Sequence, residues 1–132
     1  MAAQTERDRA DHRRRAAEIR GRRAEALAAL FLRLKFYRIL ARRYRTPAGE
    51  IDLIAKRGKT IVFVEVKTRD EEGIAIEAIT GKGRRRIARA AELWVAAHPA
   101  AAGLDLRFDV VVVLPRRLPR HHSHMFGADG RP

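Results

Sequence analysis

The chain has 132 residues, about the length of one domain, and its 29 Lys and Arg residues against 16 Asp and Glu residues give a formal net charge of +13. This positive excess favours nucleic acid or an anionic membrane surface as partner over an acidic protein or a neutral metabolite. A hydrophobic content of 46% excludes disorder of the whole chain, and the absence of cysteine excludes disulfides, thiolate metal sites and cysteine nucleophiles. The lack of cysteine fits a reducing compartment, and no apolar stretch is long enough to cross a bilayer, so we expect a cytoplasmic protein.

The N-terminal segment changes character at residue 21. Residues 1–20 combine many arginines with four acidic residues and almost no large apolar side chain, so we expect a basic, solvated helical arm. From residue 21 onward, apolar residues recur at helical spacing and predict a buried first helix. Residues 36–45 predict the first strand, because aromatic and aliphatic residues alternate there with basic ones.

Two further strands are predicted over residues 50–57 and 60–68. They are separated by Gly58 and Lys59, and Gly at the first loop position is typical of a type II′ hairpin turn. This turn sets the register, so that the residue numbers of two facing residues add up to 117. One face of the hairpin is then wholly apolar and is predicted to be the buried face. Its members are Ile51, Leu53, Ala55, Val62, Val64 and Val66.

The other face of the hairpin collects charge at the end far from the turn. The register places Asp52 opposite Glu65 and Glu50 opposite Lys67. Two carboxylates directly opposite each other destabilise a strand pair, and a hard divalent cation such as Mg²⁺ would relieve their repulsion. With Lys67 to stabilise charge on a phosphate, these residues predict metal-assisted phosphodiester hydrolysis. The alternative is a solvated polar face whose ion pairs contribute little.

The second half of the chain predicts one helix and one strand. A helix ends before Pro99, and residues 106–114 predict a central strand because they are almost continuously apolar. Residues 115–132 are rich in Pro, His and Gly without periodicity, and we expect a disordered tail. The element order predicts an α/β sandwich over residues 21–114, in which helices flank a mixed sheet.

Other charged residues in the sequence favour structural or nucleic-acid-binding roles. Asp109 is expected to be the structural partner of an arginine, and the tail histidines to reflect chance composition more than a metal site. Arg69 is a candidate contact to a nucleic-acid backbone, with a plain surface charge as the alternative. Basic residues also crowd the start of the second helix, where a phosphate would be favoured, although a solvated basic face explains them too. They are Lys82, Arg84, Arg85 and Arg86.

Four segments together resemble a known family. GEIDLIA at residues 49–55 and VFVEVKTR at residues 62–69 closely resemble the YraN-type family of uncharacterised bacterial proteins. The resemblance extends through GRRAEALAALFL at residues 21–32 and RFDVVVV at residues 107–113, and so covers about residues 20–114. Members are predicted endonucleases with a restriction-endonuclease-like fold, similar to archaeal Holliday junction resolvases of the PD-(D/E)xK superfamily.

The resemblance implies a role for individual residues. It makes Asp52 and Glu65 metal ligands, Lys67 the catalytic lysine, and Glu25 the helix carboxylate that completes the site. The dipole of the first helical turn also favours a glutamate such as Glu25 without any catalytic role. One departure is visible, because Phe36 stands where relatives usually carry glycine.

The leading hypothesis is therefore a nuclease that uses Mg²⁺ or Mn²⁺ to hydrolyse phosphodiester bonds in DNA, with branched or otherwise structured DNA as substrate. DNA is preferred over RNA as partner, and the resemblance alone implies a homodimer. One alternative is a non-catalytic nucleic-acid-binding protein of the same fold, acting on RNA or at the ribosome. The other alternative is a peripheral membrane protein. Such a protein needs an amphipathic anchor, which the N-terminal arm lacks.

Overall fold

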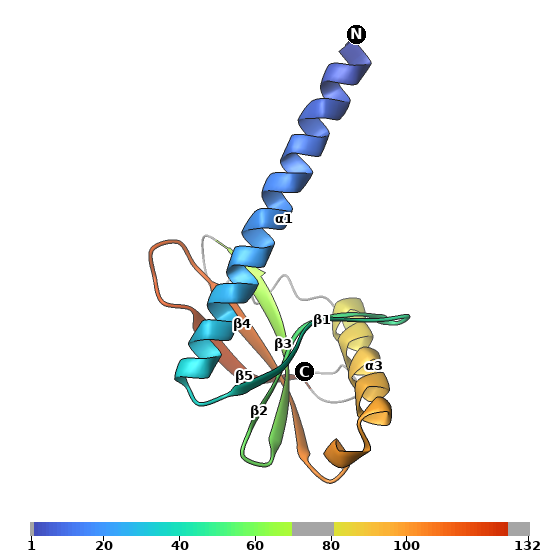
Figure 1. The fold of residues 1–132 in the computed structure, drawn as a ribbon, viewed down its shortest axis with the longest axis vertical. Coiled ribbons are helices and arrows are strands. Elements are labelled where there is room, and N and C mark those ends of the chain that lie inside the picture. Colours follow the sequence, from blue (N-terminus) through green and yellow to red (C-terminus); the bar gives the residue numbers. More distant parts are fainter. Residues whose placement is uncertain (1, 70–80, 127–132) are drawn as a thin grey trace.

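The structure, a computed structural model, describes residues 2–69 and 81–126. The long helix α1 comes first, and three strands, a second helix with a short 3-10 turn, and two strands follow it (Figure 1). The bounds are α1 Ala2–Leu34, β1 Arg38–Thr46, β2 Gly49–Arg57, β3 Thr60–Thr68, α3 Gly81–Ala97, η1 Pro99–Ala101, β4 Asp105–Val113 and β5 Arg120–Phe126.

The described strands form one mixed sheet in the order β1-β2-β3-β4-β5. Strands β3 and β4 are parallel, and the other neighbouring pairs are antiparallel. Parallel neighbours require a crossover connection, which contains α3. In the hairpin between β2 and β3, Gly58 has a φ of 62° while Lys59 does not have a positive φ, as the predicted type II′ turn requires.

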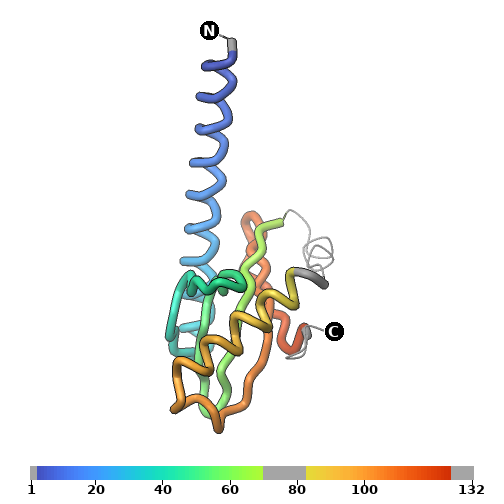
Figure 2. The backbone as a smooth tube through the Cα atoms, turned by 90° about the vertical axis from the view of Figure 1, so that its right-hand side faces the viewer, coloured from blue at the N-terminus to red at the C-terminus, as the bar shows by residue number. Residues whose placement is uncertain are grey.

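The two helices cover opposite faces of the sheet (Figure 2). Helix α1 packs Ala28, Ala29 and Leu32 on one face, and α3 packs residues such as Ile87 and Trp94 on the other. This helix–sheet–helix arrangement confirms the predicted α/β sandwich with a mixed sheet, and it agrees with a restriction-endonuclease-like fold.

Burial of the hairpin differs from the prediction in one respect. The face predicted to be mixed is also covered, because Ile54 and Phe63 are fully buried beneath α3. Ile51 was predicted to share one buried face with Leu53, but it packs in the core beneath α3 while Leu53 packs beneath α1. Both faces of the central strands are therefore apolar, as in sheets enclosed by helices.

Helix α1 is longer than its buried part. It runs without interruption through Gly21, and its N-terminal half extends well beyond the sheet (Figure 1). Its buried residues begin at Ala24, so residues 2–20 of the expected arm are helical and residues 3–20 are mostly exposed. Within the described residues, no helix is both long and apolar enough to cross a membrane.

The sequence predicted a disordered C-terminal tail over residues 115–132, but part of this segment is a strand. Residues Arg120–Phe126 form β5, an edge strand antiparallel to β4. The prediction failed because β5 lacks apolar alternation and is held by a polar contact, between His121 and the buried Asp109. Residues 127–132 lie outside the described part of the chain.

Candidate metal centre and basic groove

Strand β2 changes the face that its residues occupy at Asp52. Leu53 packs in the core beneath α1, whereas Ile51 packs in the core beneath α3, although residues two apart in a regular strand share a face. On the neighbouring strand, Arg43 has a φ of 52° and lies between the residues that pair with Leu53 and Ile51. These irregularities bring Asp52 close to Glu25 on α1.

The backbone pairing between β2 and β3 ends at the same place. The predicted register is confirmed where residues 53–57 pair with residues 60–64. Beyond this ladder, the Val66 N–H donates a hydrogen bond of 2.8 Å to the Asp52 carboxylate. Asp52 and Glu65, which were predicted to face each other, lie beyond the last backbone pair of the ladder. There the Asp52 side chain bridges the two strands instead.

Three carboxylates meet beside this bridge. Glu25, Glu50 and Asp52 each offer an oxygen, and these oxygens all lie within 4.8 Å of one another. Glu25 comes from α1 and is buried, whereas the other two come from β2. Such a set of closely spaced carboxylate oxygens from rigid elements suits a hard divalent cation.

Cationic side chains border the carboxylates. Arg43 Nε donates to Glu25 Oε2 at 2.5 Å, and Lys67 Nζ lies 3.1 Å from Glu65 Oε1. Glu65 and Lys67 are therefore side by side on β3, as the Glu-x-Lys spacing predicted. The left-handed backbone of Arg43 is unusual for a residue other than glycine, and here it accompanies the contact with Glu25.

The pKa of Asp52 is raised to about 7. Burial is the main cause, and the negative charge of Glu65 is the next; Glu25 adds to the effect. The hydrogen bond from Val66 and the charge of Lys67 oppose it. Crowding of buried negative charge thus disfavours the ionised carboxylate, and a bound cation would reverse this.

The structure brings together the four residues that the resemblance assigned to the site, and it adds Glu50. Glu25, Asp52 and Glu50 form the close group, while Glu65 pairs with Lys67 beside it. Glu50 was placed on the polar face of the hairpin by its alternation with Asp52, but it was not assigned as a ligand. That alternation was the signal that could have identified it.

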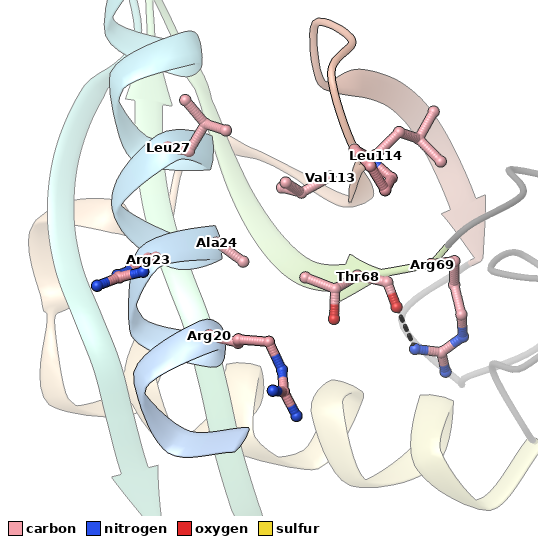
Figure 3. A pocket seen from close by; sticks show the side chains of 9 residues that line it. Arg20, Arg23, Ala24, Leu27, Thr68, Arg69, Val113 and Leu114 are labelled. Carbon is pink, nitrogen blue, oxygen red and sulfur yellow. Dashed lines mark hydrogen bonds between the residues drawn. The ribbon is translucent and has the colours of Figure 1, made fainter. Parts of the chain in front are cut away.

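A groove of about 490 Å³ lies between α1 and the ends of β3 and β4 (Figure 3). Arg20, Arg23 and Arg69 contribute to its lining, and Arg69 donates to the Thr68 carbonyl oxygen at 2.6 Å. Ala24 and Thr68 line the groove and are the sequence neighbours of Glu25 and Lys67, which do not line it. The candidate contact Arg69 therefore stands in a basic groove.

The other basic candidates lie at the start of α3. Arg84 is half-buried, and Arg85 and Arg86 are exposed. A Cβ built on Gly49 would lie 3.5 Å from the Cβ of Arg86, so this turn of α3 packs beside the start of β2. The side chain of Lys82 lies outside the described part of the structure.

Asp109 is the structural partner of an arginine, as predicted. The guanidinium of Arg107 donates to both of its carboxylate oxygens, at 2.9 and 2.8 Å, and also to the Tyr37 hydroxyl at 2.6 Å. His121 Nε2 lies 2.6 Å from Asp109, and Lys35 Nζ lies 2.6 Å from His121 Nδ1. This network ties β5 and the end of α1 to β4.

The sheet between two helices, with clustered carboxylates beside a lysine, defines an α/β protein with a candidate cation site. The chain belongs to the uncharacterised protein family UPF0102, whose family model matches residues 24–113. This confirms the resemblance to the YraN-type family.

Relatives from several bacteria are similar over most of their length, and each of these is called a UPF0102 protein. One from Methylorubrum extorquens is 54% identical over 118 residues, which is 89% of this chain and 92% of the relative. Another, from Methylocella silvestris, is 56% identical over 108 residues, 82% of this chain and 87% of the relative. A third, from Parvibaculum lavamentivorans, is 55% identical over 101 residues and 76% of both chains.

Proposed function

We propose that the protein is a metal-dependent endonuclease that hydrolyses phosphodiester bonds in structured or branched DNA. The observation that carries this proposal is the meeting of Glu25, Glu50 and Asp52 beside the pair of Glu65 and Lys67. The resemblance to PD-(D/E)xK nucleases supports the same reaction class.

The residues present fit Mg²⁺ or Mn²⁺. Three carboxylate oxygens within 4.8 Å form an all-oxygen donor set, which is the chemistry that these hard cations prefer. The raised pKa of Asp52 shows that the metal-free site accumulates negative charge at a cost. The cation would be held by Glu25, Glu50 and Asp52. Glu65 would join them once it exchanges its contact with Lys67 for one with the cation. When bound, it would supply Lewis-acid activation of water and of the phosphate.

The protein side chains have separate tasks in this proposal. Lys67, which pairs with Glu65 while no cation is bound, places a positive charge where negative charge develops on the phosphate oxygens. Arg43 holds Glu25 in place through its hydrogen bond to the Glu25 carboxylate. Asp52, fixed by the Val66 N–H, is positioned to orient an attacking water once its carboxylate is ionised.

The surface around the site accounts for the choice of substrate class. The groove presents Arg20, Arg23 and Arg69, and the first turns of α3 add further arginines. Arginine contacts to phosphates provide affinity without reading bases. We therefore assign recognition to the shape of the DNA. The homodimer implied by the resemblance stays a prediction.

Cleavage of a defined panel of nucleic acids tests the proposal. Labelled linear duplex, single-stranded DNA, a four-way junction and RNA are incubated with the wild type in Mg²⁺, Mn²⁺ or EDTA. We expect metal-dependent products from a junction or another structured DNA, and their loss in Lys67→Gln. Glu92→Gln, which removes an exposed carboxylate on α3, is the matched control. Products from the wild type that persist in EDTA would contradict the proposal.

Metal binding tests the assignment of Glu50 separately. Titration calorimetry with Mn²⁺ is expected to show binding that is weakened about tenfold or more in Glu50→Gln and unchanged in Glu92→Gln. Equal binding by both variants would remove Glu50 from the site.

A second candidate function rests on a different observation. The protein's own cations already neutralise part of the cluster, because Arg43 pairs with Glu25 and Lys67 with Glu65. A non-catalytic protein that binds DNA or RNA needs no metal ion, because these two ion pairs stabilise the carboxylates. It would bind nucleic acid with unchanged or raised affinity in Asp52→Ala and Lys67→Ala variants, and no cation would give cleavage.

A further inference from the structure

A second cavity lies on the other side of the sheet from α1, at the edge formed by β1. Its volume is about 350 Å³, within the range of about 300–1,000 Å³ that is typical of small-molecule sites. Apolar and aromatic side chains line most of it, and they come from β1, β3, α3 and the segment after α3. They include Ala41, Tyr44, Ile61, Trp94, His98 and Leu104.

The aromatic rings of this cavity are ordered by one another. His98 stacks on Trp94 with ring centroids 4.3 Å apart and an interplanar angle of 17°. Tyr44 approaches His98 edge-on at 6.5 Å. His98 Nδ1 lies 2.7 Å from the Trp94 carbonyl oxygen, which can only accept, so Nδ1 carries the hydrogen and the ring is fixed. The cavity thus offers preorganised aromatic surfaces.

Two cations also line the cavity, and they face each other across a strand pair. Arg38 of β1 is the register partner of Lys56 of β2, and both border the cavity. Like charges directly opposite each other destabilise a sheet. None of the described lining residues is acidic, and among residues 2–69 and 81–126 no carboxylate forms an ion pair with either cation. An anionic group would relieve this repulsion.

We infer that this cavity binds an unstacked nucleotide, with the base among the aromatic side chains and the phosphate on Arg38 and Lys56. A planar ring and a phosphate joined in one ligand match the two halves of the site. Stacking of bases on aromatic side chains, together with cations along the backbone, is the common way in which proteins hold single-stranded nucleic acid.

The place of the cavity relates it to the carboxylate site. Arg43 contacts Glu25, while the next residue, Tyr44, lines the cavity, so the two sites lie on opposite sides of β1. A strand that passes around this sheet edge would meet both. The origin of the nucleotide in a nucleic-acid strand rests on the proposed function, whereas the binding of a nucleotide does not require cleavage.

Trp94 is the only tryptophan in the sequence, so its fluorescence reports on this cavity directly. We expect adenosine 5′-monophosphate and a short single-stranded oligonucleotide to change the emission of the full-length protein saturably. Arg38→Gln and Lys56→Gln should each weaken binding about tenfold, the factor expected for one charge-assisted contact. Lys59→Gln, a matched lysine change in the hairpin turn, should leave it unchanged. Circular dichroism confirms that each variant is folded.

Other ligands test the two halves of the site. Adenosine without phosphate should bind more weakly than the monophosphate, and phenyl phosphate more weakly still. Equal binding of phenyl phosphate, equal binding by Lys56→Gln, or no saturable change at millimolar nucleotide would overturn the inference. If the oligonucleotide fails to bind while the monophosphate binds, the nucleotide comes from a free pool and not from a strand.

The test separates this inference from the proposed nuclease. Asp52→Asn should retain the fluorescence response because Asp52 does not line the cavity. A response without cleavage by the wild type would contradict the nuclease and support the cavity. Cleavage without a response would support the nuclease and contradict the cavity.

Discussion

Phe36 ends α1 in a conformation that glycine adopts more readily. Its φ is 69°, the Phe36 N–H donates to the Arg33 carbonyl, and the Tyr37 N–H donates to the Leu32 carbonyl. These bonds form a Schellman motif, which usually has glycine at the left-handed position. The Phe36 side chain is 87% exposed and contributes little burial in return.

Phe36→Gly is therefore expected to stabilise the protein by about 1 kcal/mol, because the left-handed backbone is strained for a residue with a Cβ. Urea unfolding of the wild type, Phe36→Gly and Phe36→Ala measures this. The alanine variant keeps the Cβ and should stay close to the wild type. A glycine variant no more stable than the alanine variant would show that the helix end is not strained.

Asp52 makes stability depend on pH in the metal-free protein. Its folded pKa of about 7 lies above the ordinary value of 3.8, so between these values the folded state binds more protons than the unfolded state. Below pH 3.8 the contribution of Asp52 to the free energy of unfolding is fully present. This contribution is lost as the pH rises through 7.

Asp52→Asn removes this dependence. We expect the variant to be more stable than the wild type at pH 8 in EDTA, and the difference to shrink as pH falls through 7 toward 5. Thermal unfolding across this pH range measures the difference. A difference that grows toward low pH would mean that Asp52 is stabilised, not destabilised, by its surroundings.

At the scale of elements, the contact between β4 and β5 depends on buried charges. Burial alone would raise the pKa of Asp109, but hydrogen bonds from His121 and Arg107 outweigh this and hold the pKa below its ordinary value. The side chain of Asp109 is fully buried and that of Arg107 is 14% exposed. Each charge is therefore tolerated only because the other is present.

Asp109→Asn should lower the free energy of unfolding by about 3 kcal/mol or more, since it leaves the charge of Arg107 buried without its counter-ion. Hydrogen exchange should also rise in β5, which loses the contact with His121. Glu92→Gln is the control, because its exposed pair with Arg89 contributes about 0–1 kcal/mol. Similar losses in both variants would contradict the role of the network.

The elements with regular periodicity could be predicted from the sequence, and those held by distant contacts could not. The hairpin followed from Gly58 and the alternation on either side, and β4 from its apolar run. Strand β5 was missed because its stabilisation depends on Asp109, which is distant in sequence. The irregularity at Arg43 and Asp52 has no local signal either, whereas Glu50 could have been identified from its alternation with Asp52.

At the scale of the whole molecule, arginines lie along the projecting arm, at the start of α3, and in the groove between α1 and the ends of β3 and β4. The groove arginines are Arg20, Arg23 and Arg69. Phosphate contacts make binding weaken with salt, by about 0.9 in the logarithmic slope for each phosphate neutralised.

The triple variant of Arg20, Arg23 and Arg69 to glutamine should reduce the salt slope of DNA binding by about 2, a value between two and three lost contacts. The control removes three arginines of the arm, Arg7, Arg9 and Arg13, and should reduce the slope less. Fluorescence anisotropy at several salt concentrations measures both. A larger effect of the arm variant would place the main binding surface on the projecting helix.

The most direct test of the central claim is the single-turnover cleavage rate of a labelled four-way junction in Mg²⁺ or Mn²⁺, compared between the wild type, Asp52→Asn and Glu92→Gln. The carboxylate site predicts cleavage by the wild type and by Glu92→Gln, and a rate at least about a hundredfold lower in Asp52→Asn, as for other essential catalytic groups. Equal rates in all three proteins would contradict the assignment of the reaction to this site.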